Sequence, residues 1–302
     1  MELEALEKKI KKEFKNAEKE VIKKADLYFE QFKKADKKML KMYKSGEITK
    51  KEYIAWRKKK MTVGDEFKKL EITIAGYYVN ATLIANKMIN DNIPYSFTNA
   101  LNYATFEIEK MAKVNTSFTI IDEGTVTSLI KDNPNLLPKA KLPKGVMRWN
   151  VGKVNSALLQ GIIAGDDINK IANRLSAVTN QAGASSIRTA RTLTTASENV
   201  GRLRSYERAI GMGIQMKKVW IATEDSRTRH SHAILDGEEQ EAEDTFSNGC
   251  KFPADPDGEP KEIYNCRCTM KSKIESISYS DAVYKDSKVA SMSYDRWKRS
   301  RR

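Results

Sequence analysis

The sequence predicts an α+β protein that is mostly α-helical, with a long N-terminal helical hairpin or bundle followed by a smaller α+β domain that contains a short sheet. Apolar residues at the start of the chain recur at spacings of three and four, which is the period of an amphipathic helix. The best strand candidates both lie late in the chain, at 216–222 and 264–273. A composition of 40% hydrophobic and 31% charged residues suits helices with a large polar surface.

A narrow apolar stripe predicts one long amphipathic helix at the N-terminus, which Ser45 and Gly46 end. Stripes of this width occur in coiled-coil seams and on helices packed against one another. We favour burial within an antiparallel bundle over an oligomeric coiled coil, because partner helices follow in the same chain. The stripe consists of Leu3, Leu6, Ile10, Phe14, Ala17, Val21, Ala25, Tyr28, Phe32, Ala35, Met39 and Met42.

Two further helices follow in the N-terminal half. One is expected from about Thr49. The other should continue until Asn92-Ile93-Pro94, because proline cannot donate the backbone hydrogen bond that a helix requires. Its stripe consists of Phe67, Leu70, Ile74, Tyr77, Ala81, Ile84 and Met88.

The segment 133–145 holds three of the seven prolines and is typical of an extended linker. We therefore expect a helical region over 1–132, the Pro-rich linker 133–145, an α+β domain over 146–275 and a basic tail over 276–302. Within the domain, short helices are predicted at 149–163 and 167–175, with Asp166 or Asp167 capping the second. A long helix at 184–210 should end at Gly211 and Gly213.

Both histidines and all three cysteines lie between Trp220 and Cys268. His232, Cys266 and Cys268 offer an imidazole and two thiolates suited to structural Zn²⁺, and His230, Cys250 or Asp225 are candidates for a fourth ligand. The spacing is not that of a standard zinc finger. Because Cys-x-Cys on a strand points its side chains to opposite faces, both thiols reach one ion only where the chain turns sharply. The alternative is that these residues are neutral and packed in the core.

Four segments of the C-terminal half carry recognisable motifs, namely GIIAGDDINKIANRL (161–175), RTARTLTTASENVGRLRSYERAIGMG (188–213), DSRTRHSHAILDG (225–237) and NCRC (265–268). In this order they resemble the Mu F-like phage head morphogenesis family, also called minor head or minor capsid proteins. The resemblance identifies 146–275 as the Mu F-like domain. It also implies a ligand-capable His or Cys at the position of His232, while Arg229 stands where some relatives carry another Cys.

The resemblance further implies a protein built into the phage head in a few copies, inside the virion near the portal vertex. It would associate with the portal protein and, as further expected partners, with scaffold and major capsid protein. During assembly we expect it in the bacterial cytoplasm with reduced thiols. No membrane association is expected, since the longest weakly polar stretch, around 157–165, is far too short to cross a bilayer.

Charge is distributed unevenly behind the net value of +14. Residues 1–60 carry 20 basic and 11 acidic side chains, and residues 285–302 carry 7 and 2, whereas 224–262 carry 4 and 12. Both ends should therefore attract a polyanion, and we expect non-specific contact with double-stranded DNA. A solvated helix face is the alternative explanation of the basic N-terminus. The candidate DNA-binding residues are Arg296, Lys298, Arg299, Arg301 and Arg302.

An enzyme is the other class that the sequence brings into question. The run from Asp225 through Arg227, Arg229 and His230 to His232 has residue types found in metal-dependent nucleic-acid hydrolases. The sequence shows neither a phosphate-cradling glycine loop nor a Ser/His/Asp set to accompany it. We therefore expect binding and positioning without turnover, with a metal-dependent hydrolase as the alternative function.

Overall fold

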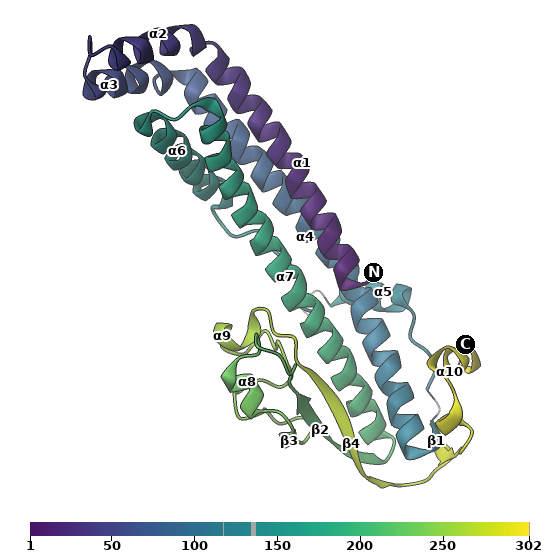
Figure 1. Ribbon diagram of the computed structural model, residues 1–302. Coiled ribbons are helices and arrows are strands. Elements are labelled where there is room, and N and C mark those ends of the chain that lie inside the picture. Colours follow the sequence, from purple (N-terminus) through teal and green to yellow (C-terminus); the bar gives the residue numbers. More distant parts are fainter. Residues whose placement is uncertain (117, 134–136, 302) are drawn as a thin grey trace. The chain divides into compact units, whose positions relative to one another are not determined.

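The computed structural model describes residues 1–116, 118–133 and 137–301, and Figure 1 shows its elements in chain order. The helices are α1 (Leu3–Glu30), α2 (Lys33–Lys44), α3 (Lys50–Met61), α4 (Asp65–Ala112), α5 (Glu123–Asp132), α6 (Val146–Ala164), α7 (Ile168–Gly211), α8 (His230–Ile234), α9 (Pro260–Ile263), the 3₁₀ helix η1 (Val289–Ser291) and α10 (Tyr294–Ser300). The strands are β1 (Val114–Thr116), β2 (Ile214–Ile221), β3 (Glu239–Gln240), β4 (Thr269–Ile277) and β5 (Val283–Lys285). The predicted α+β class with a predominance of helix is confirmed.

Contacts divide the chain into two compact units that do not follow the linear order of the predicted domains. One unit contains 1–6, 89–140 and 188–302, and the other contains 7–88 and 141–187. Each unit therefore combines segments that are far apart in the chain. The predicted domain boundaries at 132, 145 and 275 stay a prediction.

The unit of residues 7–88 and 141–187 consists of helical segments. Ile10, Phe14 and Val21 of the first apolar stripe are buried, as are Ile74 of α4 and Leu158 of α6. The predicted helical bundle is thereby confirmed. The part of the stripe on α1 serves the protein's own core, whereas its continuation on α2 has no buried residue. The long first helix is divided in the structure, because a turn in which the Phe32 N–H bonds the Phe29 carbonyl separates α1 from α2.

Helix α3 begins where the sequence predicts. Thr49 accepts a hydrogen bond from the Glu52 N–H at 3.2 Å, and the Glu52 carboxylate accepts one from the Thr49 N–H at 2.8 Å. This reciprocal capping box satisfies two amides that the helix itself leaves without partners.

The predicted end of a helix at Pro94 is wrong, because α4 continues through this proline to Ala112. On either side of the proline, Ile93 and Phe97 are buried in a cluster with Val126 and Leu137. Burial of this face compensates for the missing backbone hydrogen bond, which is how tertiary packing overrides a local helix breaker.

The two helices predicted at 167–175 and 184–210 are also one element, α7. Asp167 caps it as predicted, accepting from the Lys170 N–H at 2.9 Å. In the middle of α7, a Cβ at Gly183 would lie 3.2 Å from the Phe14 ring. This glycine therefore allows a close helix contact without interrupting the helix.

The unit of residues 1–6, 89–140 and 188–302 holds the sheets. Three strands pair antiparallel in the order β3-β2-β4, with Trp220 opposite Met270 and Ile214 opposite Ile277. Figure 1 shows this sheet beside the second half of α7, and Tyr206 of that helix is buried in the same core as Trp220. A second pair, β1 with β5, was not predicted. The strand expected over 264–273 begins only at Thr269, and this delay shapes the site described below.

Residues 276–302, predicted as a basic tail, contain β5, η1 and α10. Trp297 is buried, and its indole Nε1–H donates to the fully buried Glu109 carboxylate of α4 at 2.5 Å. Arg301 pairs with the same carboxylate at 2.7 Å, and Thr116 donates to it through its backbone N–H at 2.9 Å. The C-terminal helix is thus anchored to α4 through a buried charge. Within the described part of the chain, no helix has the length and apolarity needed to cross a membrane.

The crossing of α4 and α7 should depend on Gly201. A Cβ there would lie 2.5 Å from the Phe97 carbonyl oxygen and 3.1 Å from the Leu101 nitrogen, and neither backbone atom can move alone. We expect Gly201→Ala to lower the free energy of unfolding by about 1–3 kcal/mol. The measurement is chemical denaturation followed by circular dichroism.

Gly152→Ala is the matched control. Gly152 lies inside α6 with no atom within 4 Å of an added Cβ, so alanine should raise stability by about 0.5–1 kcal/mol. Equal stability of the two variants would show that the α4–α7 spacing does not require glycine.

Candidate metal site

His232, Cys266 and Cys268 come together in the structure. His232 lies on α8, and both cysteines precede β4. The His232 Nδ1 atom is 3.4 Å from the Cys268 Sγ and 3.7 Å from the Cys266 Sγ. The three ligand atoms lie within 4.8 Å of one another, and all three side chains are buried. This group has the donor set and the spacing that could hold one metal ion.

The backbone at 264–268 explains how two cysteines one residue apart can face one point. This segment lies between α9 and β4 and is not a strand, and Asn265 has a φ of 56°, in the left-handed region. A non-glycine residue in this region is uncommon and is held there by its surroundings. The chain therefore makes the turn that a Cys-x-Cys metal site requires.

Glu262 of α9 supports the imidazole from the opposite side. Its Oε2 lies 2.9 Å from the His232 Nε2, and Ser231 donates to the same oxygen at 3.1 Å. The Nε2–H is not aligned for a full hydrogen bond. A buried carboxylate at this distance orients the ring so that Nδ1 faces the thiols, which is the arrangement of many metal-bound histidines. Sequence reasoning missed Glu262, since it is one of many acids in its segment.

The two thiols influence one another. The pKa of Cys268 is lowered, because its thiolate accepts hydrogen bonds from Cys266, from the His232 ring and from the Thr223 N–H. The pKa of Cys266 is raised, because its thiol is hydrogen-bonded to Cys268 and buried. One thiolate and one thiol in the absence of metal is the state that this pair favours.

None of the three proposed fourth ligands joins the group among the described residues. Asp225 forms a two-pronged ion pair with Arg267, which holds the pKa of that carboxyl well below its usual range. Cys250 is buried elsewhere, and burial raises the pKa of its thiol to about 11. His230 is exposed at the start of α8.

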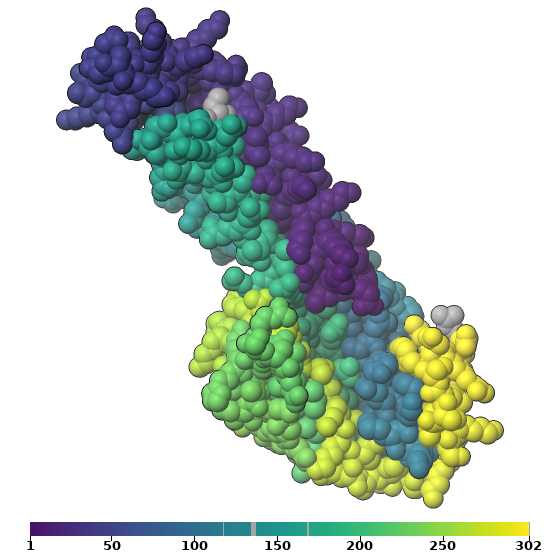
Figure 2. All heavy atoms as spheres, in the orientation of Figure 1, coloured from purple at the N-terminus to yellow at the C-terminus, as the bar shows by residue number. Residues whose placement is uncertain are grey.

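The space beside the group is small. A cavity of about 10 Å³ adjoins His232, Cys266 and Cys268, and Thr223, Thr228 and Arg229 line its other side. This is roughly the volume of a single water molecule. Arg229, which lines this cavity, donates to the Tyr264 carbonyl. Such a site suits a structural ion better than a substrate, since catalytic zinc needs an open position. Figure 2 shows the green to yellow-green residues of this region as continuous surface.

Comparison with known proteins places this group inside a recognised domain. Residues 152–271 match the family described as "Phage Mu protein F like protein", and the matched range contains His232, Glu262 and both ligand cysteines. Residues 152–271 are therefore similar to the Mu F-like family. The predicted resemblance, including the motifs at 161–175, 188–213, 225–237 and 265–268, is confirmed by this match.

Two curated proteins are similar over most of the chain. The chain is 27% identical over 190 residues to "Minor head protein GP7" of Bacillus phage SPP1, which covers 61% of this chain and 60% of that protein. It is 28% identical over 202 residues to "NAD(+)--arginine ADP-ribosyltransferase EFV" of Enterococcus faecalis, which covers 64% of this chain and 40% of that protein. The chain thus spans less than two thirds of either relative. No solved structure matches it significantly.

Three of the residues proposed from sequence to hydrolyse nucleic acid, Arg227, Arg229 and His232, line the same small cavity. Asp225 is engaged by Arg267, His230 is exposed, and His232 is buried with the thiols. Arg227 extends into solvent with 74% of its side chain exposed. Asp225 and His230 do not line the cavity that the other three members of the run share.

The candidate DNA-binding residues also differ in their surroundings. Arg296 and Arg299 are exposed on α10, and Lys298 is half-buried. The Arg301 side chain is only 11% exposed and pairs with Glu109, so it meets a phosphate only by breaking a buried ion pair. Arg302 lies outside the described residues.

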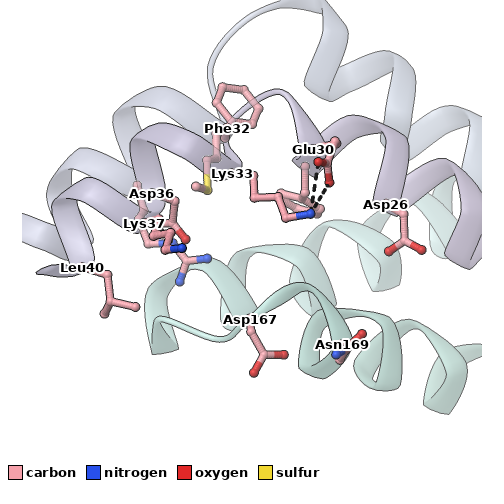
Figure 3. Close-up of a pocket in the computed structure, with 12 residues that line it drawn as sticks. Asp26, Glu30, Phe32, Lys33, Asp36, Lys37, Leu40, Asp167 and Asn169 are labelled. Atoms are coloured by element: carbon pink, nitrogen blue, oxygen red, sulfur yellow. Dashed lines mark hydrogen bonds and ion pairs between the residues drawn. The ribbon is translucent and has the colours of Figure 1, made fainter.

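The helical unit contains a larger pocket of about 510 Å³. Figure 3 shows that its charged side chains have both signs, and Glu30 and Lys33 form an ion pair at 3.0 Å. Arg57 is buried beside Asp36 at 3.2 Å and donates to the Asp166 carbonyl at 2.8 Å. These pairs stabilise the meeting point of α2, α3 and α6–α7, and no catalytic arrangement accompanies them among the lining residues.

Proposed function

We propose that this chain is a minor head protein that associates with the portal protein during procapsid assembly in a tailed phage or prophage. The observation that carries the proposal is the Mu F-like match over residues 152–271, joined by similarity to a protein named as a minor head protein. A role in the virion and a transient stay in the bacterial cytoplasm follow from this assignment. Scaffold and major capsid protein are further proposed partners.

The helical unit supplies apolar surface for such contacts. The stripe is buried from Leu6 to Ala25 and is unavailable there, but Leu27 is 63%, Val63 is 70% and Ile72 is 54% exposed. Exposed apolar side chains that form one patch are characteristic of surfaces that bind other proteins. We propose that these side chains contribute to binding the portal.

Co-expression with the cognate portal protein tests this proposal. The wild-type protein should be retained by tagged portal and should be found in purified heads. Replacing Leu27, Val63 and Ile72 with serine should weaken retention by about tenfold for each side chain that the partner buries. Ile234→Ser is the control, since Ile234 is equally exposed, at 68%, but lies on α8.

Circular dichroism must show unchanged helicity in the triple variant. Retention by scaffold or major capsid protein and not by portal would redirect the proposal to those partners. Wild-type protein that is missing from heads and not retained by portal would overturn the assignment.

We also propose non-specific binding of double-stranded DNA through the basic ends. The exposed Arg296 and Arg299 are the part of the C-terminal segment best placed for phosphate. Removal of the whole segment would be uninformative, because Trp297 and Arg301 anchor it to Glu109. Charge reversal on the surface is the better perturbation.

The double variant Arg296→Glu and Arg299→Glu should bind DNA more weakly at every sequence. The slope of log affinity against log salt should fall by about 0.9 for each phosphate that the variant no longer neutralises. Lys261→Glu reverses one basic side chain within residues 224–262, which are acidic overall, and should leave the slope unaltered. Sequence-specific binding, or no binding at low salt, would contradict the proposal.

The third proposal is that His232, Cys266 and Cys268 hold a structural Zn²⁺. An imidazole nitrogen and two thiolates are donors that zinc prefers, and a buried carboxylate behind the histidine is a common support. Bound zinc would contribute its binding free energy to folding. The ion would join α8 to the segment before β4.

Purified protein should contain about one zinc ion per chain and melt at a lower temperature after treatment with a chelator. Cys268→Ser should lose the metal and the sensitivity to chelator. Cys250→Ser is the matched control, because Cys250 is also buried but lies outside the group, and it should retain zinc. Metal-free wild-type protein with an unchanged melting temperature would leave a packed core as the role of these residues.

We propose that the chain acts by binding and positioning, without turnover. The match to the ADP-ribosyltransferase covers 40% of that protein, so its named activity can belong to the larger part that has no counterpart here. The remaining alternative is a metal-dependent nucleic-acid hydrolase. His232→Ala separates the two, since a hydrolase would lose DNA cleavage, whereas a structural role predicts lower stability and no cleavage by either protein.

A further inference from the structure

Polar side chains line the face of α7 that meets the Cys-x-Cys segment. Thr192, Thr195 and Asn199 are spaced by three and four residues and therefore project from one side of the helix. Thr192 is 5% and Asn199 is 1% exposed. Buried polar groups in a helix are costly unless they are hydrogen-bonded, so their partners indicate why they are there.

The partners are backbone groups of residues 265–268. Thr192 accepts a hydrogen bond from the Asn265 N–H at 3.1 Å. Thr195 donates to the Cys266 carbonyl at 3.0 Å, and Asn199 donates to the Cys268 carbonyl at 3.2 Å. Residues 265–268 have no strand partner, and α7 forms a hydrogen bond to three of these four residues.

Asn199 makes the most connections of the three. Its amide also donates to the Pro253 carbonyl at 3.2 Å, and its Oδ1 accepts from Thr269 at 3.4 Å. Asn199 therefore connects the loop at Pro253, Cys268 and the start of β4 to one position on α7. Asparagine is a poor helix former. The hydrogen bonds of its side chain are therefore the simpler explanation of why an asparagine occupies this position of α7.

We propose that Asn199 is a positioning residue for the metal site. By holding the Cys268 carbonyl it keeps the Cys-x-Cys segment turned, so that both thiols face His232. Without it the segment can extend β4 toward Tyr264, which would direct the two thiols to opposite faces. This inference rests on the proposed zinc function, but the position of the thiols can be measured without metal.

The test compares Asn199→Leu with Asn102→Leu. Asn102 is a matched control, because it is a buried helical asparagine, 3% exposed, that holds the Ile121 backbone through hydrogen bonds at 2.8 and 3.3 Å. Asn199→Leu should weaken zinc binding by about 10- to 100-fold, the usual effect of losing an outer-shell partner. Asn102→Leu should not change the zinc affinity, although it should lower stability.

Two readouts separate positioning from general destabilisation. In the Co²⁺-substituted protein, the thiolate charge-transfer and d–d bands should weaken or shift in Asn199→Leu and stay unchanged in Asn102→Leu. In metal-free protein, Cys266 and Cys268 of Asn199→Leu should react faster with a thiol reagent than those of the protein with Asn199. All samples also carry Cys250→Ser, so that only these two thiols are measured. Thr195→Val, which removes one hydrogen bond and keeps the side-chain shape, should act in the same direction and serves if Asn199→Leu does not fold.

The outcomes distinguish this inference from the zinc proposal. If wild-type protein binds no zinc but Asn199→Leu accelerates thiol labelling, the positioning role stands and the zinc proposal fails. If the Asn199 and Thr195 variants match wild type in zinc affinity, Co²⁺ spectrum and labelling, the positioning role is overturned. Equal effects from Asn102→Leu would also overturn it, since they would reflect stability alone.

Discussion

The hydrogen bonds between α7 and residues 265–268 are the interaction on which the C-terminal part of this protein depends. The segment lacks a strand partner, so its carbonyls must find hydrogen-bond donors elsewhere, and Thr195 and Asn199 provide them. Because the backbone is fixed in this way, Cys266 and Cys268 reach one side and meet His232. A long helix therefore acts as the template for a site whose donors come from short, irregular elements.

A buried carboxylate organises the C-terminus by the same principle. Glu109 is fully buried, and such a carboxylate is stable only with several donors around it. Trp297, Arg301 and Thr116 provide them, so the basic segment is divided between an anchoring side and an exposed side that keeps Arg296 and Arg299. Net charge alone does not distinguish these two uses, although they have opposite consequences for DNA binding.

These features agree with a protein that binds and positions other components of a phage head. The apolar stripe of α1 is buried in the protein's own core. Exposed apolar side chains and charged side chains remain available for contacts with other molecules. The cavity beside the His/Cys group has about the volume of one water molecule, and Arg229 is among the residues that line it.

The sequence by itself determined the helical class, the strands β2 and β4, the resemblance of residues 152–271 to the Mu F-like family and the three clustered donors, because periodicity, residue type and local motifs carry that information. Only the tertiary structure decided which distant residues contact these elements and donors. Pro94 stays inside α4 because its surroundings are buried, and Glu262 supports His232 from 30 residues away as one acid among many. Arg301 turns inward to Glu109 across 192 residues. Contacts at such separations leave no local pattern, since they arise only when distant segments share one core.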